Sequence, residues 1–276
     1  MIEKEFDVSG AITFWSLQPT SFDAVRRALD AAGFGCCMPN PRTDRSALDN
    51  GIDAVYGTKD KIKVSRKRPK TNGIEVVNIE RDECRNGYVL NFGAKVVDGR
   101  VHVDTGYADE YRLTEEYLKS KAVLTTAAVG QALTEVIARM DGMKGFDRSG
   151  VYYVPEHWLE QWKAVGDAIE ACQKGNRVTT VRTVMDAGTA RAIRDALTKE
   201  VQEKAGQLLD DVSKGTLNDG QLHTRAEQAQ GLVDRVSLYS AILSEGLEGL
   251  KNVAALAQGA AAAAVMQDFA SVGVCA

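Results

Sequence analysis

Residues 219–262 have the sequence DGQLHTRAEQAQGLVDRVSLYSAILSEGLEGLKNVAALAQGAAA. Apolar or small residues recur there in steps that alternate between four and three positions: Leu222, Ala226, Ala229, Val233, Val236, Ser240, Leu243, Leu247, Leu250, Ala254, Ala257 and Ala261. A mean step of 3.5 residues keeps these positions on one side of an α-helix over several heptads. Because a lone helix with such a stripe is unstable in water, the pattern predicts one continuous helix that packs against another surface.

A second helical stripe covers residues 187–214, and the connection at 215–220 contains the turn and N-cap residues Asn218-Asp219-Gly220. A connection this short predicts a long antiparallel helical hairpin, 187–214 and about 219–262. At 1.5 Å per residue the first arm spans about 40 Å and the second about 65 Å, so the second arm would project beyond the first. We therefore expect the projecting part to mediate coiled-coil self-association into a homo-oligomer, through Leu243, Leu247, Leu250, Ala254, Ala257 and Ala261.

Residues 1–111 predict an α+β module. A strand over 6–17 and helices over 22–32 and 43–55 come first, and four strands follow at 61–67, 74–82, 88–97 and 100–105. Asp98-Gly99 is a strong signal for a two-residue hairpin turn. These features predict an antiparallel β-meander with two helices on one face.

Residues 112–276 predict a mostly helical domain. A helix is expected from about 114 to 140 and another from about 156 to 173, where Trp158 and Trp162 follow the helical period and are expected to be core residues. Short strands at 151–154 and 177–185 are expected to pair with each other. The predicted fold class is α+β, a meander module followed by a helical bundle with a long hairpin and a short strand pair.

The segment 59–70 carries seven cations and one carboxylate. Alternate residues of a strand share a face, so its lysines are expected to form a row with about 7 Å between neighbours. This spacing is close to that of successive phosphates along one nucleic-acid strand. The sequence therefore predicts a DNA or RNA contact through Lys61, Lys63, Arg66, Lys67, Arg68 and Lys70.

The same lysines have a second interpretation, because charged side chains commonly protect an exposed edge strand from aggregation. The protein would then be a structural or scaffolding assembly protein without a nucleic-acid role. A third interpretation is an enzyme whose active site follows no known motif, with His102 or His157 among several carboxylates. A net charge of −4 argues against wholesale polyanion binding but allows a local basic patch.

No sequence motif indicates catalysis, a metal or a cofactor. The chain has no P-loop, no dinucleotide-binding glycine motif and no zinc-protease or serine-hydrolase signature. Five cysteines are scattered without metal-ligand spacing, which predicts neither a disulfide framework nor a zinc site. The first residues lack an apolar leader, and the alanine-rich run 253–266 is too short to span a bilayer. We expect a cytoplasmic, self-associating, non-enzymatic accessory protein that contacts nucleic acid and no membrane.

Overall fold

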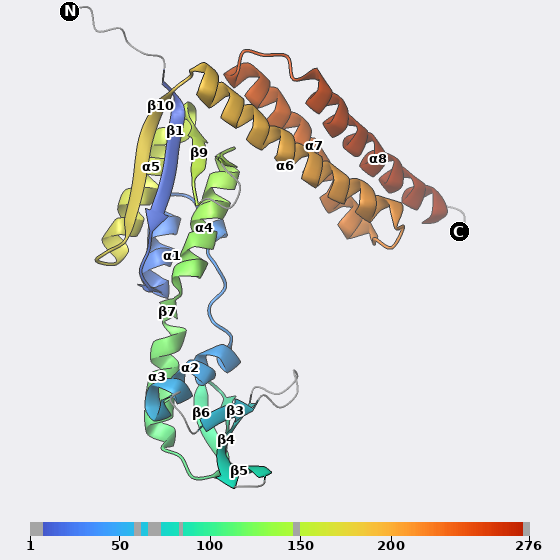
Figure 1. The fold of residues 1–276 in the computed structure, drawn as a ribbon. Helices are drawn as coiled ribbons and strands as arrows, with labels where there is room; N and C mark the ends of the chain where they lie inside the picture. The colour runs from blue at the N-terminus through green and yellow to red at the C-terminus, as the bar shows by residue number, and fades with distance from the viewer. Residues whose placement is uncertain (1–7, 58–61, 66–72, 83–84, 146–149, 273–276) are drawn as a thin grey trace, which may run out of the picture. The chain divides into compact units, whose positions relative to one another are not determined.

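The computed structural model describes residues 8–57, 62–65, 73–82, 85–145 and 150–272 (Figure 1). Its fold is mixed α+β, as predicted, with antiparallel strands in the N-terminal part and long helices in the C-terminal part. The chain divides into two compact units. The meander unit comprises residues 16–134 and 165–177, and the bundle unit comprises 1–15, 135–164 and 178–276. This division differs from the boundary expected near residue 111, because the first strand belongs with the C-terminal segments.

The meander consists of β3 (Ile62–Ser65), β4 (Gly73–Asp82), β5 (Arg85–Val97) and β6 (Arg100–Gly106). They pair antiparallel and in chain order. Asp98 and Gly99, between β5 and β6, have φ values of 48° and 75°. Positive φ at both central residues is what a tight hairpin with right-handed strand twist requires. This turn is therefore confirmed, and so are the four predicted strands within the described residues; positions 61, 66 and 67 of the first strand lie outside them.

One face of the meander packs against α2 (Asp44–Tyr56) and α3 (Glu110–Lys121). The shared core consists of Ala47, Leu48, Ile52, Phe92, Ala94, Val101, Leu113 and Tyr117. The helix expected beside α2 was the one over residues 22–32. That helix forms as α1 (Phe22–Ala31) with Ser21 as its N-cap, but its buried residues are not part of this core. The second covering helix is α3 instead.

The helix predicted over about 114–140 is interrupted. Helix α3 ends at Lys121, β7 (Val123–Leu124) pairs antiparallel with β2 (Thr20–Ser21), and α4 (Thr126–Arg139) follows. The Thr125 hydroxyl accepts a hydrogen bond from the Ala128 N–H at 3.1 Å, as an N-cap does. This cap and the strand pair start a new helix where the apolar pattern alone predicts continuation. A 3₁₀ turn, η1 (Gly35–Cys37), follows α1.

The bundle unit contains a second sheet with the strand order β10–β1–β9–β8. Its strands are β1 (Val8–Ser16), β8 (Met143–Lys144), β9 (Tyr152–Pro155) and β10 (Arg177–Val184). The expected pairing of 177–185 with 151–154 is wrong, because β1 lies between them and pairs antiparallel with β9. The 3₁₀ turn η2 (Glu156–Trp158) leads into α5 (Leu159–Cys172).

Trp162 of α5 is fully buried, which confirms its predicted core role. A buried indole N–H needs an acceptor. Two threonines on neighbouring strands provide it: Trp162 Nε1 donates to Thr13 Oγ1 at 3.1 Å and to Thr180 Oγ1 at 3.2 Å.

Three long helices complete the bundle unit: α6 (Ala187–Ser213), α7 (Asp219–Ile242) and α8 (Glu248–Val272). Helix α6 starts at the N-cap Asp186 and α7 at the N-cap Asn218, which forms a capping box with Gln221. Both starts were predicted. The prediction of one continuous helix over 219–262 is wrong. The chain leaves the helix at 243–247, and α8 returns alongside α7 and α6 (Figure 1).

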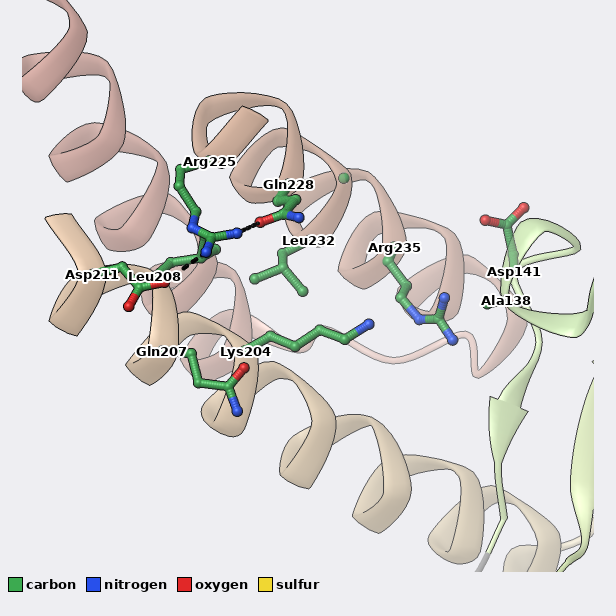
Figure 2. A pocket seen from close by; sticks show the side chains of 11 residues that line it. Ala138, Asp141, Lys204, Gln207, Leu208, Asp211, Arg225, Gln228, Leu232 and Arg235 are labelled. Atoms are coloured by element: carbon green, nitrogen blue, oxygen red, sulfur yellow. Dashed lines mark hydrogen bonds and ion pairs between the residues drawn. The ribbon is translucent and has the colours of Figure 1, made fainter. Parts of the chain in front are cut away.

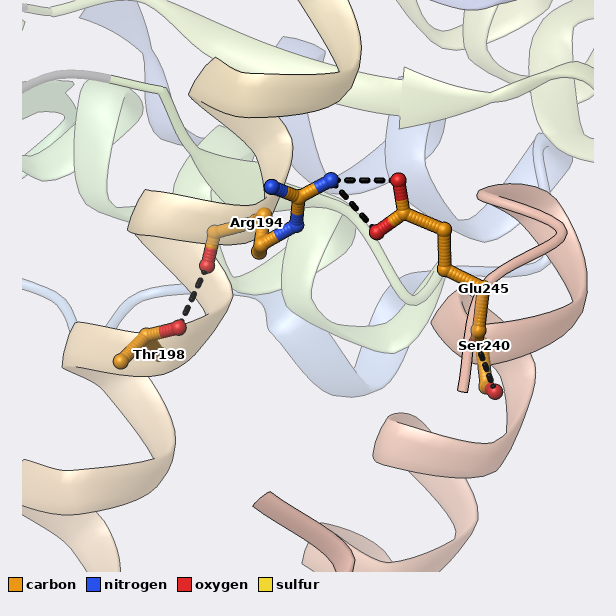
Figure 3. A network of polar contacts seen from close by, with 4 residues as sticks. All are labelled: Arg194, Thr198, Ser240 and Glu245. Atoms are coloured by element: carbon orange, nitrogen blue, oxygen red, sulfur yellow. Dashed lines mark hydrogen bonds and ion pairs between the residues drawn. The ribbon is translucent and has the colours of Figure 1, made fainter. Parts of the chain in front are cut away.

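The interruption is stabilised by contacts of its own. Ser244 adopts a left-handed φ of 50°, and the Ser240 hydroxyl donates to the Glu245 carbonyl at 2.5 Å. The Arg194 guanidinium of α6 pairs with the Glu245 carboxylate and so connects α6 to the loop (Figure 3).

The residues predicted for self-association lie in the bundle's own core. Leu243, Leu247, Leu250, Ala254, Ala257 and Ala261 are all buried there. The physical requirement that led to the prediction, a partner for an apolar helical stripe, is met within the chain by α6 and α7. Because the second arm folds back, these six residues are buried without a second copy of the chain.

Candidate nucleic-acid interface

The predicted basic contact lies largely outside the residues that the structure describes. Lys61, Arg66, Lys67, Arg68 and Lys70 fall in undescribed segments. The backbone at Lys63 is described and lies in β3, which hydrogen-bonds to β4. Within the described part of the sheet, β3 is an edge strand.

The strand register shows which face of the meander the Lys63 position occupies. Val64 pairs with Val76, and Val76 pairs with Phe92. Directly opposed residues on antiparallel strands share a face, and successive residues alternate between faces. Position 64 is thus on the face of Phe92, which packs on α2 and α3. Position 63 is on the opposite face, which these helices leave uncovered.

The uncovered face of the meander, called the open face below, carries further cations. Lys95 and Arg100 are exposed there, as is His102, which is the cross-strand partner of Lys95. Position 75, a glutamate, also belongs to this face, because Glu75 pairs with Ser65. Among the side chains that the structure describes, Lys95 and Arg100 therefore give the open face two exposed cations from different strands.

The bundle unit contains a polar pocket of about 480 Å³ between α6 and α7 (Figure 2). Eleven residues line it: Ala138, Asp141, Lys204, Gln207, Leu208, Asp211, Arg225, Gln228, Gly231, Leu232 and Arg235. They come from the end of α4 and from the facing sides of two long helices, so no local motif could have indicated the pocket.

The charges in this pocket compensate one another. Arg225 pairs with Asp211 at 2.8 Å, and Glu200 pairs with Lys204 at 2.6 Å and with Arg235 at 3.2 Å. Arg235 also donates to the Gly142 carbonyl, and its guanidinium lies 5.9 Å from the centre of the Tyr239 ring. Three cations (Lys204, Arg225 and Arg235) face three carboxylates, because Asp141 also lines the pocket beside Asp211 and Glu200, so the pocket offers no net charge to an anionic ligand. We interpret it as an ion-pair network that joins α6, α7 and the turn after α4.

The histidines considered for catalysis lie in separate parts of the fold. His102 and His157 are exposed and belong to different units. Among the described residues, no three His, Cys, Asp or Glu side chains are grouped to hold a metal ion. Of the described helices, none combines the length and apolar character needed to cross a membrane.

Comparison with known proteins identifies a family but no characterised relative. No curated protein and no solved structure matches the chain. A family model described as "Family of unknown function (DUF6744)" matches residues 10–268. Since the match spans most of the 276 residues, the chain belongs to this family of unknown function, DUF6744.

Proposed function

We propose that this protein is a non-enzymatic accessory protein that contacts the phosphate backbone of nucleic acid through its meander. The contact surface consists of the cations of segment 59–70 and those of the open face. The observation that best supports it is the strand register, which puts position 63 on the face that α2 and α3 leave uncovered. A cation row on that face can approach a polyanion without displacing any packed helix.

Such a contact would be electrostatic and independent of base sequence. Cations that neutralise phosphates release condensed counterions, so the affinity falls steeply as the salt concentration rises. The chain as a whole has a charge of −4, so only a local cluster of cations can produce the attraction. We expect dissociation constants in the range of ~10⁻⁴–10⁻⁶ M at physiological salt.

The proposal is tested by fluorescence anisotropy with a labelled oligonucleotide over a series of salt concentrations. The test variant replaces four cations of the segment with alanine: Lys61, Lys63, Lys67 and Arg68. The expected result is that this variant no longer binds the oligonucleotide at low salt. Where residual binding can be measured, the slope of log K against log salt should be smaller by about 3, because each phosphate contact contributes about 0.7–0.9.

A matched control removes the same charge from exposed positions outside the segment. Its four alanine substitutions are at Lys163, Lys174, Arg191 and Lys214. This variant should keep the wild-type affinity and slope. The proposal is wrong if wild-type protein does not bind at low salt, or if both quadruple variants lose affinity equally.

The main alternative is that the lysines only protect an edge strand, with the protein serving in assembly. Measuring the solution mass by light scattering, with and without the oligonucleotide, separates the two. Edge protection with assembly predicts an oligomer whose mass does not change on addition. We also propose a cytoplasmic location, as expected from the cysteine pattern. In that compartment the protein would have access to nucleic acid.

A further inference from the structure

The turn between α7 and α8 ends a helix without the residue that usually ends one. The Ser244 N–H donates to the Ala241 carbonyl at 3.1 Å, and the Glu245 N–H donates to the Ser240 carbonyl at 3.1 Å. These two bonds form a Schellman C-cap, in which the left-handed position is most often a glycine. Here the left-handed residue is Ser244, with a φ of 50°, and the glycine follows two positions later. The end of α7 is therefore strained at its capping residue.

The polar contacts that hold this turn lie at the surface. The Arg194 guanidinium pairs with the Glu245 carboxylate, and these side chains are 39% and 43% exposed (Figure 3). Exposed ion pairs contribute little to stability. The hydrogen bond from the Ser240 hydroxyl to the Glu245 carbonyl is also exposed. Opening the turn costs these exposed contacts, but it also removes the strain at Ser244.

The sequence through the turn is compatible with an unbroken helix. Leu243 and Leu247 are four positions apart, so the apolar stripe of α7 continues into α8 in phase. Residues 219–272 contain no proline. If the turn opened, α7 and α8 would form one helix with its apolar residues along one side.

A second copy of the chain can supply the packing that an opened helix loses. In the closed chain, α8 packs on α6 and α7 through residues that include Leu250, Ala254 and Ala257. In a pair of opened chains, α8 of each copy meets the identical surface of the other copy. The two opened helices would lie antiparallel about a two-fold axis at the turn, as α7 and α8 do within one hairpin. The contacts of α8 within one chain would then recur between two chains.

We infer that two copies of this chain exchange α8 and form a dimer in which residues 243–247 are helical. Exchange of an identical element is a low-cost route to a dimer, and a short, strained hinge loop favours it. The dimer is closed, because each copy gives one α8 and receives one. The inference concerns the bundle unit alone and does not depend on nucleic-acid contact.

The inference is tested by size-exclusion chromatography with light scattering on the full chain. The protein is held at high concentration in urea below its unfolding transition and then returned to buffer. Wild type should give a dimer of twice the chain mass beside the monomer. The dimer should persist on dilution, because α8 must unpack before the two chains can separate.

The first test variant, Ser244→Ala/Gly246→Ala, favours a helical hinge. Its dimerisation constant should rise at least roughly 10-fold, because each dimer contains two hinges and alanine is the better helix former at both positions. The closed form also accepts the change at Gly246, where an added Cβ would lie 3.8 Å from its nearest neighbour.

A proline at the start of α8 separates the two forms. Glu248 is the first residue of α8, a position where proline fits a helix. In the exchanged form the same position lies inside a continuous helix, where proline removes a hydrogen bond and clashes with the preceding turn. Glu248→Pro should therefore leave the monomer folded and reduce the dimer below detection. The matched control Glu248→Ala removes the same carboxylate and its ion pair with Lys251, and it should dimerise as wild type does.

Cross-linking shows which chain contributes α8. The Gln258 amide of α8 donates to the Gln230 amide oxygen of α7 at 2.5 Å in an exposed contact. In the variant Gln230→Cys/Gln258→Cys, a short bismaleimide should join two chains in the dimer fraction and link α7 to α8 of one chain in the monomer fraction. Gln230→Cys alone is the control for the native cysteines.

Each of three results would overturn the inference. The first is wild-type protein that remains monomeric under these conditions. The second is a Glu248→Pro variant that dimerises as much as wild type. The third is a dimer fraction in which the cross-linker joins α7 and α8 of single chains, because the copies would then associate through another surface.

Discussion

The substitution Tyr239→Phe is expected to destabilise the bundle unit by about 2 kcal/mol. Tyr239 of α7 is fully buried, and its hydroxyl donates to the Asp141 carbonyl at 2.6 Å. Arg235, one helical turn earlier, donates to the carbonyl of Gly142. Two consecutive carbonyls in the turn after α4 are therefore bound by α7. The turn needs such donors because Asp141, with a φ of 54°, directs the chain out of the helix.

The expected loss of about 2 kcal/mol follows from which contacts of Tyr239 a phenylalanine keeps and which it lacks. The ring and its tilted contact with Tyr153, at 6.3 Å between centroids, are retained, so no cavity forms. The lost hydroxyl leaves a part-buried carbonyl without this donor, which costs about 1–3 kcal/mol. With an m-value of about 2 kcal/mol/M, the urea midpoint should fall by about 1 M.

Tryptophan fluorescence is the appropriate assay because it reports on one unit. All three tryptophans, Trp15, Trp158 and Trp162, lie in the bundle unit. Their fluorescence in a urea titration therefore follows this unit even if the meander unit unfolds separately. The matched control is Tyr111→Phe, whose hydroxyl is on an 83% exposed side chain and whose removal should change stability by less than about 0.5 kcal/mol.

An unchanged midpoint for Tyr239→Phe would show that the hydroxyl does not hold the turn. A shift as large as the ~3–5 kcal/mol typical of losing a whole aromatic side chain would also contradict the reasoning, because it would mean that the ring repacks.

Two further substitutions test other parts of the fold. Burial and a hydrogen bond to Asp44 raise the pKa of Tyr117 to about 12, so the folded meander unit retains a proton that the unfolded chain releases above about pH 10. This contribution to stability is complete below pH 10 and is lost as the pH rises towards 12. In thermal unfolding followed by circular dichroism, Tyr117→Phe should lose less stability than wild type over that interval, and an equal loss would contradict the assignment. Ser244→Gly should raise the urea midpoint by an amount equivalent to about 0.5–1 kcal/mol, because glycine adopts a φ of 50° without steric strain. A lower midpoint for this variant would show that the serine is not strained.

The sequence predicted local structure well where short-range chemistry determines it. Ser21, Asp186 and Asn218 start helices by accepting backbone hydrogen bonds, and Asp98-Gly99 makes the hairpin turn. Each of these features depends on residues within a few positions of one another. Sequence inspection can recognise them without knowing the rest of the fold.

The predictions that were wrong concern which segments, far apart in the sequence, pair or pack with each other. Strand β1 was assigned to the N-terminal module, but it pairs with β9, more than a hundred residues later. Its alternation of apolar and polar residues indicates a strand but says nothing of which strand it joins. The polar pocket between α6 and α7 is likewise a product of packing, and the open face could be identified only once the register was known.

The break between α7 and α8 shows why periodicity alone predicted one continuous helix. Leu243 and Leu247 are four positions apart, so the alternating steps continue across a loop as smoothly as within a helix. One long helix and two shorter helices joined by a loop can therefore show the same apolar stripe in the sequence. Ser244-Glu245-Gly246 has turn composition. Gly246 also interrupts a second line of apolar residues spaced seven apart, Leu232, Tyr239 and Val253, so a sign of the break was present. Apolar burial therefore accounts for these residues within one chain.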